Sequence, residues 1–204
     1  PEGFQRKGAG IIEQVGEDVN YVQVGDHVLL SFVTYCGQCR MCTMNKVSLC
    51  EGFSAKVGYL LDDTCRLHNS LKQPVPQMAR IGTMSEYAVV PEQSLVKIDS
   101  AYSLETAVLV GCGVTTGIGA VLNTAQVKPG SWVAIVGSGG VGLNAIQGAV
   151  LASAERIIAI DLVQKKLELA KSFGATDLIN ASEANPVDQV HDLTNGKGVD
   201  YAFE

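Results

Sequence analysis

The sequence lacks features that mark several classes of protein. Its 204 residues contain 15 lysines and arginines against 21 aspartates and glutamates, and the formal net charge is -6. The charges are interspersed, without a basic block that would attract nucleic acid or an anionic membrane surface. Internal repeats and low-complexity tracts are absent as well. We therefore expect a globular protein that binds neither nucleic acid nor membranes.

Long apolar runs and a signal sequence are also missing. Uninterrupted apolar runs such as Trp132–Val136 have the length of a strand, whereas a membrane helix needs about 20 residues. The chain opens PEGFQRKGAG, without the apolar core of a secretory signal and without an initiator methionine. We therefore expect a cytoplasmic protein whose natural start precedes residue 1.

Cysteine is scarce outside one short segment. Four of the six cysteines lie in CGQCRMCTMNKVSLC, residues 36–50, at the spacing C-x2-C-x2-C-x7-C. Four thiolates complete the tetrahedral coordination of Zn²⁺ and leave no position for water or substrate, so such a site is structural. The segment is polar and lacks apolar periodicity, so a metal would supply the order that a core supplies elsewhere. The predicted zinc ligands are Cys36, Cys39, Cys42 and Cys50.

Other interpretations of four clustered thiols are an iron–sulfur cluster, a redox-active C-x-x-C pair and unpaired core thiols. The short ferredoxin run ends C-x3-C-P, whereas the last gap here is seven residues and Glu51 follows. A disulfide scaffold is typical of short secreted chains, and this chain is long enough to build a core. Zinc in a reduced, cytosolic protein is the interpretation that we favour.

The first half of the chain alternates short β-prone runs with turns, which is typical of a small, mostly antiparallel β unit. The predicted strands are residues 10–15, 27–33, 86–90 and 95–98. The cysteine segment and a polar loop over residues 62–78 interrupt this pattern.

From Leu104 onward, helical patterns alternate with apolar strands, which is typical of a parallel sheet. The predicted strands are residues 132–136, 156–160, 177–179 and 199–203. A helix is predicted over residues 162–173, with Val163, Leu167 and Ala170 on its buried face and Gly174 as its C-terminal cap. We expect two domains, residues 1–112 and residues 113–204.

The first parallel strand leads into a predicted dinucleotide site. Residues Gly137-Ser138-Gly139-Gly140-Val141-Gly142 form a G-x-G-x-x-G that opens a helix. Gly137 would permit the tight turn, Gly139 would let the backbone approach a pyrophosphate, and Gly142 would let helix and strand pack closely. Backbone N–H groups at the start of the helix would then face the phosphates.

Asp161 ends the next strand, 19 residues after Gly142. Its carboxylate would accept hydrogen bonds from the adenosine ribose and repel a 2′-phosphate, which favours NAD over NADP. The alternatives are a glycine-rich turn in some other α/β protein and, for Asp161, an ordinary strand-end cap.

Taken together, these motifs resemble the zinc-containing medium-chain alcohol dehydrogenases. The resemblance runs from Gly8 to Glu204. It is carried by Gly8-Ala9-Gly10 leading into IIEQVG, VQVGDHV at 22–28, the four-cysteine segment, GCGVTTG at 111–117, GSGGVG with Asp161, and FGATDLIN at 173–180.

The resemblance implies an α/β architecture, with a GroES-like catalytic domain that carries the zinc lobe and a doubly wound Rossmann domain that binds NAD. It also implies a second, catalytic zinc, which would polarise the alcohol oxygen so that hydride passes to NAD. By resemblance, Cys112 is a ligand of that zinc. Thr116 and Val141 line the nicotinamide pocket, and Lys166 helps to hold the adenosine ribose. Taken alone, Cys112 would be interpreted as a small buried thiol.

The sequence departs from the family pattern near its start. The family places its catalytic histidine in a G-H-E triplet before the motif that matches Gly8, and this chain has Gln5-Arg6-Lys7 there. Arginine offers no lone pair to a metal. Either residues 1–7 are not native, as at a truncated or frame-shifted gene end, or the protein is a divergent member without its catalytic zinc. His27, His68 and His191 are interpreted as surface or structural residues.

We therefore expect an internal fragment of a zinc-dependent, NAD-linked alcohol dehydrogenase, truncated at both ends and inactive alone. The parent enzyme would oxidise an alcohol or a hydroxymethyl-thiol adduct and would be a homodimer or homotetramer. The alternatives are a zinc-stabilised dinucleotide-binding protein without turnover, and an unrelated zinc-ribbon interaction module beside a Rossmann-like domain.

Overall fold

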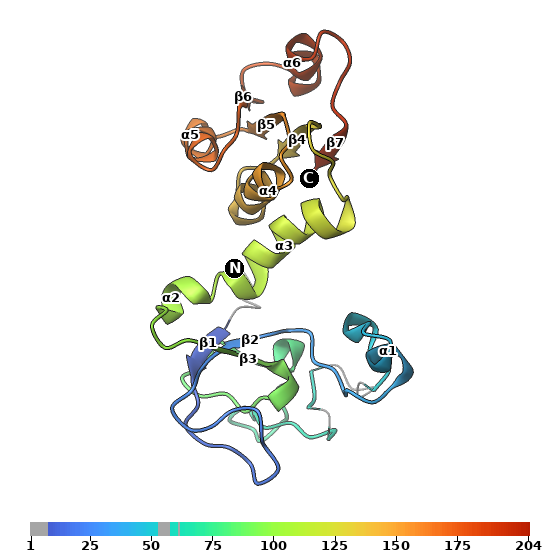
Figure 1. Cartoon of the computed structure of the whole chain (residues 1–204). Helices are drawn as coiled ribbons and strands as arrows, with labels where there is room; N and C mark the ends of the chain where they lie inside the picture. Colours follow the sequence, from blue (N-terminus) through green and yellow to red (C-terminus); the bar gives the residue numbers. More distant parts are fainter. Residues whose placement is uncertain (1–7, 53–57, 61) are drawn as a thin grey trace. The chain divides into compact units, whose positions relative to one another are not determined.

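The chain folds into two compact units (Figure 1). The computed structural model describes residues 8–52, 58–60 and 62–204. One unit ends at Cys112, and the other runs from Gly113 to Glu204. Each unit contains a β-sheet of its own.

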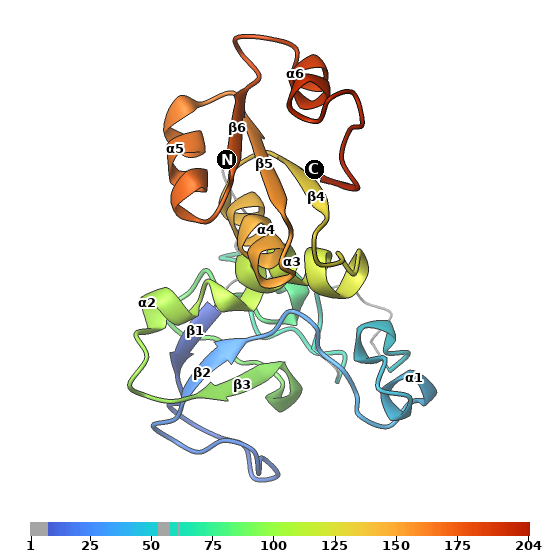
Figure 2. The same cartoon turned by 45° about the horizontal axis from the view of Figure 1, so that its top comes forward.

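The first unit is built on a three-stranded antiparallel sheet in the order β1-β2-β3, whose strands lie side by side in Figure 2. Val28 and Leu29 are buried in the central strand. The strands are β1 (Gly8–Ile11), β2 (His27–Leu30) and β3 (Leu95–Ile98). The helices are α1 (Arg40–Thr43) and α2 (Leu104–Ala107), with 3-10 turns at Val47–Leu49, Met78–Arg80 and Glu92–Ser94.

The antiparallel character of this unit is confirmed, but three strand predictions are wrong in detail. The strand predicted over residues 27–33 ends at Leu30. The first strand ends at Ile11 rather than at residue 15. Residues 86–90 form no strand: Tyr87 is 75% exposed and Val89 is 56% exposed. Intrinsic β propensity needs a neighbouring strand and a buried face to act on, and this segment has neither among the described residues.

The second unit is built on a four-stranded parallel sheet in the order β6-β5-β4-β7. Counted along this unit, the order is 3-2-1-4, so the direction of winding reverses between β4 and β7. The strands are β4 (Trp132–Val136), β5 (Arg156–Asp161), β6 (Asp177–Asn180) and β7 (Tyr201–Phe203). The helices are α3 (Thr115–Gly119), α4 (Gly140–Leu151), α5 (Gln164–Ser172) and α6 (Pro186–Leu193).

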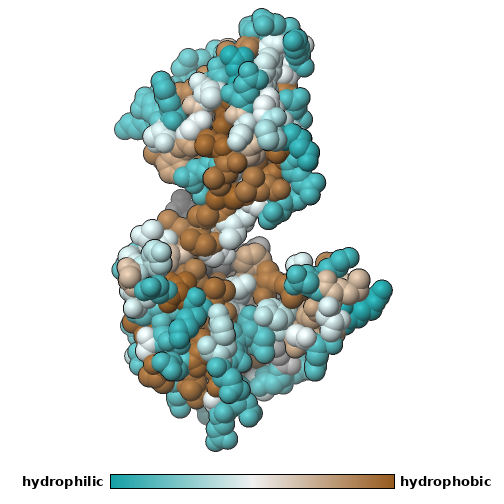
Figure 3. All heavy atoms as spheres, in the orientation of Figure 1, coloured by the Kyte–Doolittle hydropathy of each residue, from teal (hydrophilic) through white to brown (hydrophobic). Residues whose placement is uncertain are grey.

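Helices cover both faces of this sheet because the buried side chains of β4 and β5 alternate. Val133 and Ile157 face a core that includes Ile146 of α4 and Leu167 of α5. On the other face, Ile158 lies in a second cluster against which residues of α6 pack. In Figure 3, hydrophilic side chains cover the region of α5 and α6, and apolar side chains gather over α4. The predicted doubly wound architecture is confirmed.

The helix predicted over residues 162–173 is observed as α5, which is shorter at both ends. Leu167 and Ala170 are buried as predicted, and Gly174 follows the helix with φ +112°. Val163 is instead the extended N-cap residue and is 45% exposed, so its place on the buried face was wrong. The last strand begins at Tyr201 rather than at residue 199.

One helical run corrects the expectation that no apolar stretch reaches membrane length. The helix Leu104–Thr124 has 21 residues and contains an 18-residue window with a mean hydropathy of 1.5, so by length and composition it could cross a membrane. It is irregular, since π-helical turns at Val110–Val114 and Ala120–Thr124 flank α3. A Cβ on Gly117 would lie 2.5 Å from the carbonyl oxygen of Val141, so α3 packs tightly on α4. Within the described chain, 17% of the apolar window of this run is buried.

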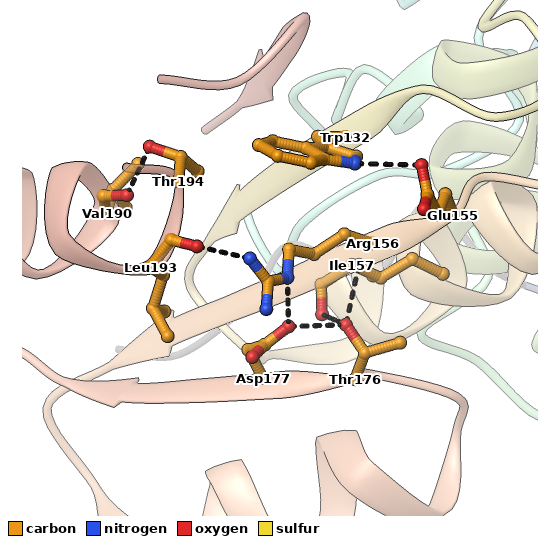
Figure 4. A network of polar contacts seen from close by, with 9 residues as sticks. All are labelled: Trp132, Glu155, Arg156, Ile157, Thr176, Asp177, Val190, Leu193 and Thr194. Carbon is orange, nitrogen blue, oxygen red and sulfur yellow. Dashed lines mark hydrogen bonds and ion pairs between the residues drawn. The ribbon is translucent and has the colours of Figure 1, made fainter. Parts of the chain in front are cut away.

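Polar side chains tie together the amino ends of the parallel strands (Figure 4). Arg156 pairs with Asp177 (Nε to Oδ2, 3.0 Å) and donates to the carbonyl oxygen of Leu193 at the end of α6. Its guanidinium lies 5.5 Å from the ring centroid of Trp132, whose indole N–H donates to Glu155. This network links side chains at the edge of the sheet that lies opposite the glycine turn.

Candidate coenzyme site and metal centre

The four predicted zinc ligands come together in the first unit. Their sulfur atoms all lie within 4.8 Å of one another. The Sγ–Sγ distances are 3.5 Å between Cys39 and Cys42, 3.9 Å between Cys39 and Cys50, and 4.0 Å between Cys36 and Cys42. A regular tetrahedron with Zn–S bonds of about 2.3 Å has sulfur–sulfur edges of about 3.8 Å. The cysteines are therefore spaced to hold a single zinc ion.

This spacing separates the interpretations that the sequence left open. The cysteines of an iron–sulfur cluster bind different irons, which sets their sulfurs farther apart than the ligands of one ion. None of the four forms a disulfide, as an oxidised C-x-x-C pair would. They line a shared centre rather than packing separately into the core. A structural zinc site fits best.

Backbone N–H groups point at the cysteine sulfurs and would stabilise thiolates. Cys36 N–H donates to the sulfur of Cys50 (3.2 Å), Glu51 N–H to that of Cys39 (3.4 Å), and Gly52 N–H to that of Cys50 (3.4 Å). A Cβ on Gly52 would lie 2.6 Å from both Cβ and Sγ of Cys36. Gly52 was not predicted from the sequence, where its only signal is a glycine two residues after the last cysteine.

The thiols differ in acidity because their surroundings differ. Hydrogen bonds from the backbone N–H groups of Cys42 and Glu51 lower the pKa of Cys39 to about 6. Burial, together with a hydrogen bond to the sulfur of Cys39, raises the pKa of Cys42 to about 12. The pKa values of these neighbouring thiols are thus shifted in opposite directions, and a bound cation would favour the thiolate form of all four.

The glycine turn of the second unit has the shape that a dinucleotide needs. Gly137 has φ +92°, which only glycine adopts without strain. A Cβ on Gly137, Gly139 or Gly140 would meet nothing within 4 Å, so the turn faces open space. A Cβ on Gly142 would lie 1.8 Å from the carbonyl oxygen of Gly137. The turn can therefore accept a phosphate at close range, and α4 can pack against it only through a glycine.

Asp161 lies beside this turn and is held in place. Its Oδ2 accepts a hydrogen bond from Ser138 N–H (2.8 Å), and its Oδ1 accepts one from Val163 N–H (2.9 Å). The ammonium group of Lys166 lies 3.8 Å from Oδ2. Burial alone would raise the pKa of Asp161, but these two N–H groups and Lys166 outweigh it and lower the pKa. The carboxylate is thus kept ionised beside the turn.

The other predicted site residues are distributed over both units. Thr116 is exposed on α3. Its neighbour Gly117 packs on α4 at the carbonyl oxygen of Val141. Val141 lies in the first turn of α4 and is 48% exposed. Cys112 is half-buried in the π-helical turn at the end of the first unit. Arg6 and Lys7 lie outside the described residues.

A second metal site is not assembled within the described part of the chain. There, the four-cysteine centre is the one group of three or more cysteine, histidine or acidic ligands that could share an ion. Cys112 is not among them. The ligand set of a catalytic zinc is therefore incomplete in the described residues, and we assign no chemical step to it.

The sequence resembles known zinc-dependent dehydrogenases. A family model for the alcohol dehydrogenase GroES-like domain matches residues 4–100, and one for zinc-binding dehydrogenases matches residues 140–204. The whole chain aligns with S-(hydroxymethyl)glutathione dehydrogenases of Synechocystis sp. (47% identity, 57% of that protein) and Saccharomyces cerevisiae (43% identity, 56% of that protein). The chain thus spans just over half the length of these relatives.

Solved structures resemble the chain as well. An alcohol dehydrogenase zinc-binding domain protein from Burkholderia ambifaria matches 95% of this chain and 53% of its own, with a TM-score of 0.82 and 36% identity. Benzyl alcohol dehydrogenase from Acinetobacter calcoaceticus matches 96% of this chain and 53% of its own, with a TM-score of 0.79 and 36% identity.

The chain thus combines a β unit that carries four cysteines spaced for one zinc ion with a parallel sheet that carries an open glycine turn and an acidic strand end. The chain belongs to the zinc-containing medium-chain alcohol dehydrogenase family. The resemblance drawn from the sequence motifs is confirmed.

Proposed function

We propose that the chain is part of a zinc-dependent, NAD-linked alcohol dehydrogenase that oxidises an alcohol or a hydroxymethyl-thiol adduct. One observation carries the proposal: the whole chain aligns at 43% and 47% identity with proteins named S-(hydroxymethyl)glutathione dehydrogenase. The open glycine turn and the ionised Asp161 support it. S-(hydroxymethyl)glutathione and small primary alcohols are the substrates to test first.

The second unit would bind and orient the coenzyme. The first amides of α4 have no partner within the helix, so they would donate to the pyrophosphate. A carboxylate has about four acceptor sites, so Asp161 can receive ribose hydroxyls while it keeps both of its backbone hydrogen bonds. Thr116 and Val141 would line the nicotinamide end. When bound, NAD accepts the hydride released by the alcohol carbon.

The first unit would contribute structure and one ligand. The zinc held by the four cysteines would be closed to substrate and would fix the fold of residues 36–50. Cys112 is the residue that we propose as a ligand of the catalytic zinc. The protein would act in the cytoplasm, where thiols stay reduced, as a homodimer or homotetramer.

The test is the appearance of NADH when the full-length protein that contains this chain is given NAD with glutathione and formaldehyde, or with simple alcohols. We expect turnover that requires an alcohol and is greatest when glutathione and formaldehyde are supplied together. A correctly folded, zinc-loaded full-length protein that forms no NADH with any alcohol would contradict the proposal. The 204-residue chain alone should bind NADH without turnover.

A second candidate function is a zinc-stabilised dinucleotide-binding protein without turnover. One observation favours it: Arg6 occupies the position at which the family pattern has its histidine ligand, and arginine cannot bind a metal. Zinc analysis of the full-length protein separates the candidates. Two zinc ions per chain support the dehydrogenase, whereas one zinc ion with normal NAD binding supports the second candidate.

A further inference from the structure

A polar turn follows β6 at the carboxyl edge of the parallel sheet, beside Asp161. Asn180 is the register partner of Asp161 on the neighbouring strand, and such partners lie about 4.8 Å apart. Ala181 N–H donates to the carbonyl oxygen of Asp161 (3.0 Å). The residues after β6 therefore stay against the end of β5 instead of leaving the sheet.

Asn180 holds the side chain of Glu183 in this turn. Its amide nitrogen lies 2.9 Å from Oε1 of Glu183 and 3.4 Å from Oε1 of Gln164. Its amide oxygen accepts hydrogen bonds from the N–H (3.1 Å) and the hydroxyl (2.7 Å) of Ser182. Both polar atoms of the Asn180 amide group thus form hydrogen bonds within the turn or to α5. The hydrogen bond to Glu183 holds its carboxylate at the edge of the sheet that carries Asp161.

We propose that Glu183, held by Asn180, is a second determinant of coenzyme choice, whose negative charge disfavours the 2′-phosphate of NADP in addition to the charge of Asp161. This inference rests on the proposed coenzyme site. Asp161 and the turn lie within about one Debye length of each other, so salt screens the charge of Glu183 only in part. At a separation of about one Debye length, one charge changes the affinity for a doubly charged phosphate by about three- to tenfold in a mostly aqueous setting.

The test compares dissociation constants of NAD⁺ and NADP⁺ for the 204-residue chain, measured by calorimetry. The variants are E183Q, N180A, D161N and D161N/E183Q. D192N is the matched control, because Asp192 is also exposed but lies at the end of α6, toward the amino edge of the sheet. Binding is measured in low and in high salt.

We expect E183Q to tighten NADP⁺ binding about three- to tenfold and to leave NAD⁺ binding within about twofold. The gain should shrink in high salt, D161N/E183Q should accept NADP⁺ better than D161N, and D192N should match the wild type. N180A should shift the ratio of the two dissociation constants in the same direction as E183Q, which a merely structural loss would not do.

An unchanged ratio in E183Q, or an equal shift in D192N, overturns the inference and leaves the coenzyme site standing. A shift in E183Q without one in N180A overturns the positioning role of Asn180. A wild-type chain that is folded but binds neither coenzyme overturns the proposed coenzyme site, and this inference with it.

Discussion

Substituting alanine at two glycines of the same turn should damage different properties, folding at one and coenzyme binding at the other. A Cβ on Gly142 would lie 1.8 Å from the carbonyl oxygen of Gly137, whereas a Cβ on Gly139 would meet nothing within 4 Å. We predict that Gly142→Ala damages folding of the second unit. Gly139→Ala should leave folding intact and damage only the binding of the coenzyme.

The size of the folding effect follows from the contact. Real Cβ atoms essentially never approach other atoms more closely than 3.0 Å, so the turn and α4 would have to separate by about 1.2 Å. Overpacking costs about 1–3 kcal/mol, and a clash with backbone belongs near the upper end. Alanine recovers about 0.5–1 kcal/mol of helix propensity relative to glycine. The net loss for Gly142→Ala should be about 2 kcal/mol, or about 8–16 °C in Tm for a unit of this size.

Gly139 should behave differently because its backbone is already compatible with alanine. It is the N-cap of α4, with φ -86° and ψ -170°, an extended conformation that any residue adopts. The methyl group would occupy the space that the pyrophosphate needs. We expect a change in unfolding free energy within about 1 kcal/mol and a dissociation constant for NADH raised at least about tenfold.

The assays are thermal unfolding by circular dichroism and titration with NADH by fluorescence, both on the 204-residue chain. If Gly142→Ala melts like the wild type, the close approach of α4 to the turn is wrong. If Gly139→Ala binds NADH as well as the wild type, the phosphates do not lie against this turn.

Three further predictions concern the metal, the core and acid stability. Cys42→Ser should reduce zinc from about one ion per chain to near none by elemental analysis, whereas Cys65→Ser, outside the centre, should keep it. In denaturant unfolding, Leu167→Ala should cost about 2–5 kcal/mol because Leu167 is 1% exposed, and Leu169→Ala, at 46% exposed, should cost about 0.5 kcal/mol or less. The lowered pKa of Asp161 means that its carboxylate stabilises the folded unit above the unfolded pKa of about 3.9, and that this contribution is lost as the pH falls through the folded value. The difference in unfolding free energy between wild type and D161N should therefore be largest at neutral pH and shrink in acid; a constant difference would contradict it.

The sequence predicted the second unit better than the first, for a physical reason. Strands of a parallel sheet are buried on both faces, so they read as continuous apolar runs, and β4 was predicted with its observed bounds. In the first unit, strands are short and separated by long loops. Residues 86–90 have the composition of a strand but no partner strand in the part of the chain that the structure describes, and pairing between distant segments cannot be read from local composition.

The candidate site shows the same contrast between features that local sequence predicts and features that depend on tertiary structure. The zinc centre could be predicted because all of its ligands lie within residues 36–50 and spacing alone brings them together. The role of Gly52 could not, since it depends on where the side chain of Cys36 points. Glu183 was not predicted because its turn reaches the edge that carries Asp161 only through the pairing of β6 with β5, which brings Asn180 beside Asp161.

The two kinds of site differ in whether the described residues complete them. The zinc centre and the glycine turn with Asp161 are each assembled within one unit from residues close in sequence. Cys112 has no such local ligand set among the described residues, so its proposed metal depends on groups contributed from elsewhere. Structural zinc and coenzyme binding should therefore be properties of these 204 residues, whereas the proposed turnover needs metal ligands that the described residues do not supply.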